Sequence, residues 1–201
     1  MLAEVRRASI GEARPFIEKW HYSHKVPTGK NYFFAMESGA KADLFSNETY
    51  AIACYGHSAS QSMHTGLARL TGKDVALDNM LELRRLCRRE PRDGHQLTWF
   101  LARCHKMLKK QGIKYIVSFS DPMHNHNGGI YKAANFTHLG KTQAATHNIN
   151  EAGEIVHRRI PYHHKRAQGY PDGVGMEMAR NDLGLKKYTT PPKDRWFLQI
   201  Q

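Results

Sequence analysis

The chain has 201 residues, 40% of them hydrophobic, and 30 Lys and Arg against 18 Asp and Glu leave a net charge of +12. This length predicts one domain, or one domain with a tail, and the composition excludes a disordered chain. The chain has neither an apolar run near the ~20 residues that cross a bilayer nor an apolar leader, so we expect a cytoplasmic protein without a membrane partner. The positive charge favours a polyanion as partner, of which nucleic acid is the commonest in a cytosol.

Apolar periodicity predicts alternating helices and strands. A first helix is expected over Gly11 to Tyr22, followed by extended segments at Tyr32 to Met36 and Tyr50 to Tyr55. A strand over Met80 to Cys87 leads into the strongest helix, which is expected to begin with a capping box near Asp93 and to end at Gly112.

The second half continues the alternation. A buried strand, Ile113 to Ser120, is followed by a short helix over Gly129 to Ala134 and strands around Phe136 to Gly140 and Glu154 to Pro161. Residues 58–73 and the C-terminal third after Tyr162 are expected to be loose. The order predicts an α/β fold with a mixed central sheet and helices on both faces, as in the acetyltransferase-like (GNAT) fold. We expect residues 1–165 to form this catalytic domain and residues 166–201 a basic extension packed on or next to it.

Arg85 stands out within the predicted strand. Period-two alternation gives it the same face as Leu81, Leu83 and Cys87, so it is expected to point inward. A buried guanidinium is costly without a carboxylate, and Asp121 at the end of the next strand is the candidate partner. The alternative is a register slip that turns Arg84 toward the site.

Asp121 and Tyr131 are the next candidates. Asp121 follows Ser118-Phe119-Ser120 at a strand end, where ligands bind in sheets of this kind. Tyr131 lies on the short helix and is expected to face the same crevice as a proton donor or hydrogen-bond clamp. The alternatives are an ordinary turn for Asp121 and a packed core phenol for Tyr131.

His21 and Tyr22 directly follow the first helix. A histidine with an unperturbed pKa of ~6.5 is the obvious general base, and Tyr22 could stack on a nucleobase. The alternative is a helix-terminal cap. No set of metal ligands is evident, because pairs such as His21 and His24 lack third and fourth partners.

Four arginines lie at the end of the Met80 to Cys87 strand and in the loop before the following helix, and they favour phosphate: Arg84, Arg88, Arg89 and Arg92. In the GNAT fold this loop holds the coenzyme A pyrophosphate. Here residues 88–94 lack the paired small residues of that loop, which argues against classical acetyl-CoA use and leaves another phosphate-bearing ligand open.

Together these motifs resemble the Mom family of phage DNA-modification proteins from about Arg14 to Gly140. The resemblance rests on Phe16, His21-Tyr22-Ser23, Pro27, residues 82–85, residues 118–121, His126 and residues 129–136. It implies a GNAT-like transferase that converts adenine in DNA to N6-carbamoylmethyladenine, hiding phage DNA from host restriction enzymes in the host cytoplasm.

The resemblance also implies the roles of site residues. Asp121, Tyr131 and Arg85, or Arg84 in its place, form the expected catalytic set, with His21 and Tyr22 beside them. Further expected site residues are Ser118, Ser120 and His126, and the residues expected to bind DNA or donor phosphates are Arg84, Arg88, Arg89, Arg92, Lys186 and Lys187. Lys193 and Arg195 belong to the same basic tail.

The expected partners are double-stranded DNA, an unidentified group donor and, as one option, a second copy of the chain. An aminoacyl or other activated donor and a metal such as iron both stay open. Two alternative functions remain: a GNAT-type acyltransferase acting on a protein or small molecule, and a DNA-binding protein without catalytic activity.

Overall fold

The structure, a computed structural model, describes residues 4–37, 49–58, 60, 62–89, 95–157 and 159–200. It contains two compact units. The first unit comprises the described residues up to Ser120 together with His126–Gly140 and residues 194–200, and the second comprises Asp121–Asn125 and Lys141–Lys193.

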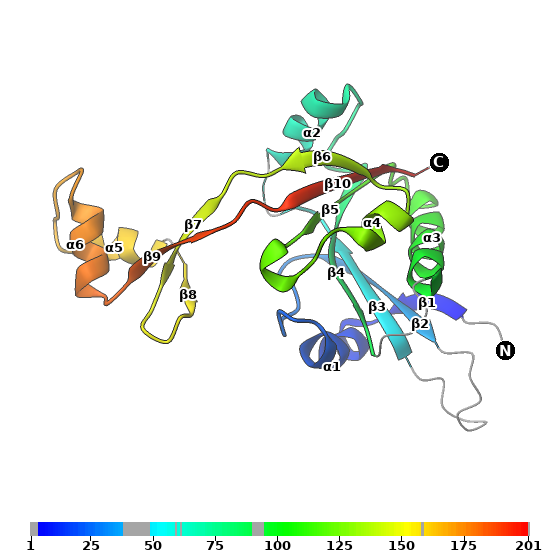
Figure 1. Cartoon of the computed structure of the whole chain (residues 1–201), viewed down its shortest axis with the longest axis horizontal. Helices are drawn as coiled ribbons and strands as arrows, with labels where there is room; N and C mark the ends of the chain where they lie inside the picture. The colour runs from blue at the N-terminus through cyan, green and yellow to red at the C-terminus, as the bar shows by residue number, and fades with distance from the viewer. Residues whose placement is uncertain are drawn as a thin grey trace. The chain divides into compact units, whose positions relative to one another are not determined.

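The first unit is built on a mixed sheet of seven strands in the order β1-β2-β3-β4-β5-β10-β6 (Figure 1). Its strands are β1 (Glu4–Ala8), β2 (Asn31–Glu37), β3 (Thr49–Gly56), β4 (Met80–Arg88), β5 (Tyr115–Ser120), β6 (Thr137–Lys141) and β10 (Asp194–Gln199). Its helices are α1 (Ile10–Trp20), α2 (Met63–Thr71), α3 (His95–Lys109) and α4 (Gly129–Ala133). Strands β4 and β5 are parallel, whereas β1 to β4 and the β5–β10 pair are antiparallel.

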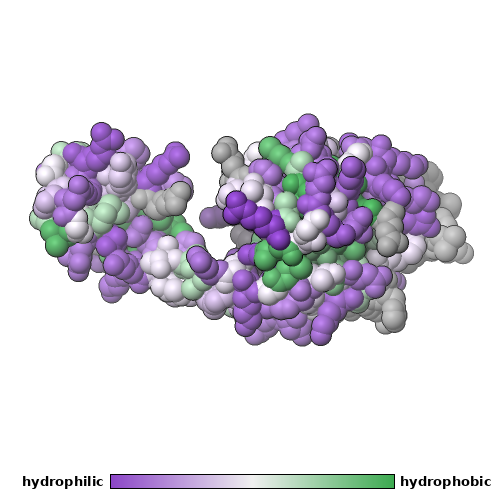
Figure 2. Space-filling model, turned by 90° about the horizontal axis from the view of Figure 1, so that it is seen from above, coloured by the Kyte–Doolittle hydropathy of each residue, from purple (hydrophilic) through white to green (hydrophobic). Residues whose placement is uncertain are grey.

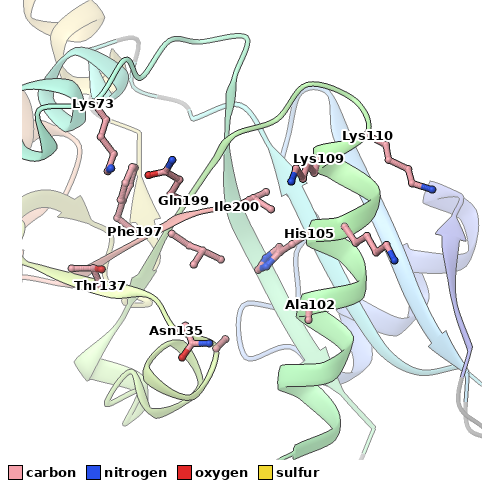
Figure 3. A pocket seen from close by; sticks show the side chains of 13 residues that line it. Lys73, Ala102, His105, Lys109, Lys110, Asn135, Thr137, Phe197, Gln199 and Ile200 are labelled. Atoms are coloured by element: carbon pink, nitrogen blue, oxygen red, sulfur yellow. The ribbon is translucent and has the colours of Figure 1, made fainter.

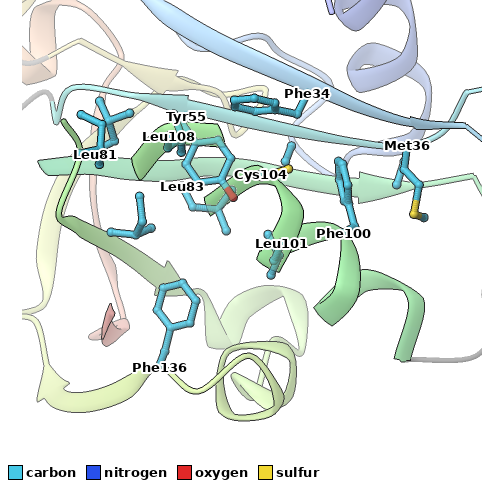
Figure 4. Packing of buried hydrophobic residues seen from close by; sticks show 14 of the residues in the cluster. Phe34, Met36, Tyr55, Leu81, Leu83, Phe100, Leu101, Cys104, Leu108 and Phe136 are labelled. Atoms are coloured by element: carbon cyan, nitrogen blue, oxygen red, sulfur yellow. The ribbon is translucent and has the colours of Figure 1, made fainter. Parts of the chain in front are cut away.

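Helices cover both faces of this sheet, as predicted. On one face Phe100, Leu101 and Cys104 of α3 pack against Phe34 and Tyr55 in a cluster that we call the α3-side core (Figure 4). Its α3 residues recur at the helical period that the sequence predicted. Each large apolar side chain buried there contributes about 1.5–3 kcal/mol relative to exposure.

The opposite face is covered by α1 and α2. Ala13 and Ile17 of α1 pack on Ile52 and Cys54 in what we call the α1-side core. Ser9 is the N-cap of helix α1, and its side chain accepts from the Glu12 backbone N–H while the Glu12 carboxylate accepts from the Ser9 N–H. This reciprocal capping fixes the start of the helix one residue before the predicted Gly11.

Strand β4 contains a bulge. Its pairing with β3 shifts so that Cys54 pairs with Arg85 and Tyr55 with Leu83, which leaves Arg84 without a partner in β3. Because side chains alternate along a strand, one extra residue moves every later side chain to the other face.

The two cores show the result of this bulge. Leu81 and Leu83 lie in the α3-side core, whereas Cys87 lies in the α1-side core. Arg85 therefore does not share a face with the leucines, and the predicted common face for Leu81, Leu83, Arg85 and Cys87 is wrong.

Several predicted boundaries are close to the observed ones, and others are wrong. Helix α2 occupies a stretch expected to be loose, and Arg159 to Pro161 begin helix α5 (Arg159–Ala167) where a strand was expected. The expected capping box at Asp93 and the loop with Arg92 lie outside the described residues.

The second unit has its own small sheet, in the order β8-β7-β9. It consists of a single 3-10 turn, η1 (Pro122–His124), strands β7 (Ala145–Ile149), β8 (Ile155–Val156) and β9 (Lys186–Thr190), and helices α5 and α6 (Gly175–Asp182). His164 of α5 and Tyr170 both hydrogen-bond the Asp182 carboxylate of α6. The C-terminal third is therefore ordered, and its last strand, β10, belongs to the large sheet of the first unit.

Hydrophilic side chains cover most of the face that Figure 2 shows. Within the described ranges no helix is both long and apolar enough to cross a membrane.

Candidate active site

Strands β4 and β5 pair over only part of their length. Their partners run from Met80 with Tyr115 to Glu82 with Val117, although β5 continues to Ser120. At the point where this ladder ends, Ser118 Oγ donates to the Leu83 carbonyl at 2.9 Å. The Ser118 side chain thus takes the place of a backbone hydrogen bond between β4 and β5. This point lies toward the carboxyl ends of two parallel strands, where ligands bind in α/β sheets.

Tyr131 of α4 is held at this same point. Its hydroxyl lies 2.9 Å from Ser118 Oγ, and its ring stacks on Trp196 with centroids 5.7 Å apart. The ring of Phe136 meets Tyr131 edge-on at 5.4 Å. One hydroxyl and two rings therefore fix both the position and the tilt of the phenol.

The environment keeps Tyr131 protonated. Burial raises the pKa of its phenol above the usual 10.0, and the nearby charge of Glu82 raises it further, while the hydrogen bond with Ser118 acts in the opposite direction. A phenol of this kind is a hydrogen-bond donor at neutral pH and can give its proton to a strongly basic leaving group.

Trp196 of β10 is a site residue that the sequence reasoning missed. Its Nε1–H donates to Ser120 Oγ at 2.9 Å, and the ring of His138 lies 4.9 Å from it. A Cβ on Gly128 would lie 2.1 Å from Trp196 Cζ2, so the indole packs directly on the backbone just before α4. The alternation of Trp196, Leu198 and Ile200 in the tail was the available signal for a buried strand.

His21 and Tyr22 lie beside each other in the first unit, with ring centroids 4.2 Å apart. Tyr22 also meets the ring of His126 edge-on at 5.0 Å, and its charge is close enough to affect the pKa of Tyr131. The structure thus brings together five predicted site residues around Tyr131: Ser118, Ser120, His21, Tyr22 and His126.

The hydrogen bonds of His21 favour one tautomer. Its Nδ1 accepts from the Ser23 backbone N–H at 3.1 Å and lies 2.8 Å from Ser23 Oγ. A neutral imidazole that accepts at Nδ1 carries its proton on Nε2. In this tautomer His21 is a donor through Nε2, and its role as general base stays a prediction.

Arg84 and Arg85 donate to backbone carbonyls, and Arg84 also donates to one side chain. Arg84 Nη1 donates to the Thr28 carbonyl at 2.8 Å and to Asn31 Oδ1 at 3.1 Å. Arg85 donates from Nε to the Lys25 carbonyl at 3.2 Å and from Nη1 to the Arg84 carbonyl at 2.7 Å. Both guanidinium groups therefore hold the segment that follows His21 and Tyr22.

The expected pairing of Arg85 with Asp121 loses its basis here. Arg85 is only half-buried and is satisfied by carbonyl groups, so it does not need a carboxylate to offset burial. The inward position that motivated the pair came from the strand register that the bulge overturns.

Asp121 directly follows β5 in the chain and begins the second unit. Its Oδ1 accepts from the Met123 N–H at 3.1 Å and its Oδ2 lies 2.7 Å from Lys193 Nζ. Burial alone would raise the pKa of this carboxyl, but the Lys193 ammonium and the Met123 N–H outweigh it and hold the pKa below 3.8. Asp121 is therefore an ionised hydrogen-bond acceptor at neutral pH.

The model of the Mom protein family matches residues 3–183. The chain belongs to the Mom family. No curated protein matches it.

Solved structures similar to this Mom-family chain include acetyltransferases. Arabidopsis thaliana NAA60 in complex with acetyl-CoA is 10% identical, with a TM-score of 0.57 over 99% of each chain. A probable acetyltransferase from Staphylococcus epidermidis is 8% identical, with a TM-score of 0.53 over 100% of each chain. A putative GNAT-family acetyltransferase from Desulfovibrio desulfuricans is 9% identical, with a TM-score of 0.50 over 100% of each chain. These likenesses show that the Mom-family chain has the GNAT fold, which confirms the predicted fold.

The remaining residues that were predicted to bind phosphate belong to both units of the Mom-family chain. Arg88 ends β4 and Arg89 follows it as an exposed residue, whereas Arg92 lies outside the described residues. Lys186 and Lys187 are exposed on β9 of the second unit. Among the described residues no group of three or more His, Cys, Asp or Glu side chains could hold a metal ion.

Proposed function

We propose that this chain is a DNA-modifying transferase that attaches a carbamoylmethyl-type group to N6 of adenine in double-stranded DNA. Membership in the Mom family supports DNA as the substrate, and the net charge of +12 suits a polyanion. The observation that carries the proposal is Tyr131, a protonated phenol held by Ser118 and Trp196 where β4 and β5 cease to pair.

The reaction is a substitution at the carbon of an activated donor. The adenine N6 forms a bond to that carbon while the bond from carbon to the leaving group breaks, and N6 loses one proton. The exocyclic amine is a poor nucleophile because its lone pair is delocalised, so the enzyme must position it closely and stabilise the departing group. Tyr131 supplies the proton that the leaving group takes, and the resulting phenolate takes the proton that N6 loses, which restores the phenol.

Asp121 is proposed to orient the amine. Its low pKa makes it a weak base, but an ionised carboxylate is a strong acceptor for an amine N–H. Accepting one N–H directs the N6 lone pair toward the donor. Arg84 and Arg85 are positioning residues in this account, since their hydrogen bonds fix the segment after Tyr22.

The target adenine must leave the duplex, because its amine lies within the base stack. Tyr22 is exposed and offers a ring on which a flipped base can stack, and His126 supports it edge-on. The donor is proposed to be an activated compound whose leaving group is bound to the methylene carbon next to a carboxamide, because attack at an acyl carbon would give an amide in place of the carbamoylmethyl group.

The proposal is tested by expressing the protein in a bacterium, digesting the DNA to nucleosides and measuring modified deoxyadenosine by mass spectrometry. Modified deoxyadenosine is expected with the wild type and with Lys132→Gln, an exposed neighbour on α4. Its absence with soluble wild-type protein would overturn the proposal.

The fold gives one specific reason to consider a second function, acyl transfer to a protein or small molecule. This alternative predicts tight acetyl-CoA binding by calorimetry together with unmodified DNA. A DNA-binding protein without catalysis predicts DNA binding, no acetyl-CoA binding and no modified nucleoside.

A further inference from the structure

A second concave site lies in the first unit, away from the predicted catalytic residues. It is a groove of about 950 Å³ between the C-terminal half of α3, the end of β10 and the residues that join α4 to β6 (Figure 3). None of the described residues that line it belongs to the predicted catalytic set. Its volume lies near the upper end of the range for ligand sites in proteins, ~300–1,000 Å³.

The groove is strongly basic. Its lining includes Lys73, Lys106, Lys109 and Lys110, and none of the lining residues is acidic. None of these four ammonium groups pairs with a carboxylate of the described residues. Unpaired ammonium groups repel one another, and an anion bound between them offsets this electrostatic repulsion.

The lysines occupy two sides of the groove. Figure 3 shows Lys73 beside Phe197 and Gln199, and Lys109 across from them on α3. Polar groups of Asn135 and Gln199 lie along the lining and can donate hydrogen bonds to phosphate oxygens. The arrangement suits an extended anion with charge along its length better than a single small ion.

His105 on the wall of the groove is a second, independent sign of a ligand. The residue is 6% exposed, and its Nε2 is buried without a hydrogen-bond partner among the described residues. Figure 3 shows its ring pointing into the groove. A buried polar atom left unpaired is destabilising, so a ligand atom or bridging water that reaches it stabilises the protein.

The groove is connected to the candidate active site through one aromatic ring. Phe136 contacts His105 at 5.9 Å on one side and Tyr131 at 5.4 Å on the other. A polyanion bound in the groove therefore lies on the other side of Phe136 from Tyr131.

We propose that this groove binds the phosphate backbone of DNA, as a contact separate from the site that receives the target base. The inference rests on the proposed function for the choice of DNA over other polyanions. In this role Lys73 and Lys109 contact phosphates from opposite walls, and the contact carries no base specificity.

The test compares two variants that each remove two positive charges. Lys73→Gln with Lys109→Gln alters the groove, and Arg14→Gln with Arg103→Gln alters exposed cations outside it. Binding to fluorescent duplexes of several sequences is measured by anisotropy over a series of salt concentrations, without any donor. The groove variant is expected to bind every duplex more weakly, and its salt slope is expected to fall by about two, about one per lost phosphate contact.

Equal affinities and slopes for the two variants would overturn the inference. A second test measures how well a ligand protects Lys73 and Lys109 from reductive methylation. If a mononucleotide protected them as well as DNA does at equal phosphate concentration, the groove would hold a small anion and the inference would be overturned. These measurements need no turnover, so they test DNA binding by the groove independently of catalysis. The groove could bind DNA even if the wild-type protein left DNA unmodified, and it could fail to bind DNA even if the protein modified it.

Discussion

The Tyr131 hydroxyl lies 2.9 Å from Ser118 Oγ, and the same Ser118 oxygen lies 2.9 Å from the Leu83 carbonyl where the β4–β5 ladder ends. A serine hydroxyl has one proton, so Ser118 Oγ shares its single donor between the Leu83 carbonyl and the Tyr131 hydroxyl. The break between two strands is thereby coupled to the orientation of the phenol that we propose as the proton donor.

Replacing Tyr131 with Phe is expected to abolish modification while preserving the fold. The ring contacts with Trp196 and Phe136 are kept, and only the hydroxyl is lost. General acid catalysis contributes ~10²–10⁴-fold in rate, so modified deoxyadenosine should fall at least ~100-fold. Nucleoside mass spectrometry measures the loss, and thermal unfolding checks that the protein is still folded. A variant that modifies DNA as well as the wild type would remove Tyr131 from the chemistry.

Gly128→Ala is expected to destabilise the first unit and to disturb the site. Gly128 has φ of +76°, and its new Cβ would lie 2.1 Å from Trp196 Cζ2. The left-handed backbone alone costs about 1–2 kcal/mol for a residue with a Cβ, and displacing the indole adds to this.

Gly72→Ala is the matched control for this substitution. Gly72 also has a positive φ, +66°, but nothing lies within 4 Å of its added Cβ. Urea denaturation should show a larger loss of unfolding free energy for Gly128→Ala than for Gly72→Ala. Equal losses would mean that the contact with Trp196 is unimportant.

The ion pair of Lys193 with Asp121 is expected to stabilise the protein in a pH-dependent way. The pKa of Asp121 is held below 3.8 in the folded protein, so its contribution is present above pH 3.8 and is lost as the pH falls through the folded pKa. Lys193→Gln should therefore destabilise the protein at pH 7 and have a smaller effect at pH 3. Lys187→Gln, an exposed lysine on β9, should show no such difference. Equal losses at both pH values for Lys193→Gln would contradict the pairing.

His105 is expected to make the protein sensitive to mild acid. Burial lowers its pKa from 6.5 to about 4, so the folded protein keeps a neutral imidazole that the unfolded chain protonates. The unfolded state then binds more protons between these values, and the unfolding free energy falls as the pH drops from 6.5 toward 4.

At pH 5 this linkage amounts to about 2 kcal/mol. His105→Phe should remove that part of the acid sensitivity, whereas His163→Gln, at an exposed position on α5, should not. Denaturation at pH 7 and pH 5 measures the difference. An unchanged acid sensitivity in His105→Phe would show that another group is responsible.

The sequence predicted elements with long, regular patterns well. The apolar stripe of Phe100, Leu101 and Cys104 on α3 and the buried run of β5 are confirmed, because one-sided burial imposes the period that the sequence displays. The same reasoning failed at Arg84, where one extra residue changes the register and leaves no trace in the pattern itself.

Part of the candidate site could be predicted, because several of its residues lie in short local motifs. Ser118, Tyr22 and Tyr131 were found from local motifs, and the structure brings them together. Trp196 was missed because it reaches the site through β10, which inserts between β5 and β6 from the far end of the chain. A single sequence contains no signal for that long-range pairing.

The role of Tyr131 in DNA modification is best tested by the mass of deoxyadenosine from DNA of bacteria that express the wild type, Tyr131→Phe or Lys132→Gln. We expect a deoxyadenosine in which one carbamoylmethyl group replaces one hydrogen, present with the wild type and Lys132→Gln and lost with Tyr131→Phe. Unmodified deoxyadenosine in cells that contain soluble wild-type protein would contradict this expectation.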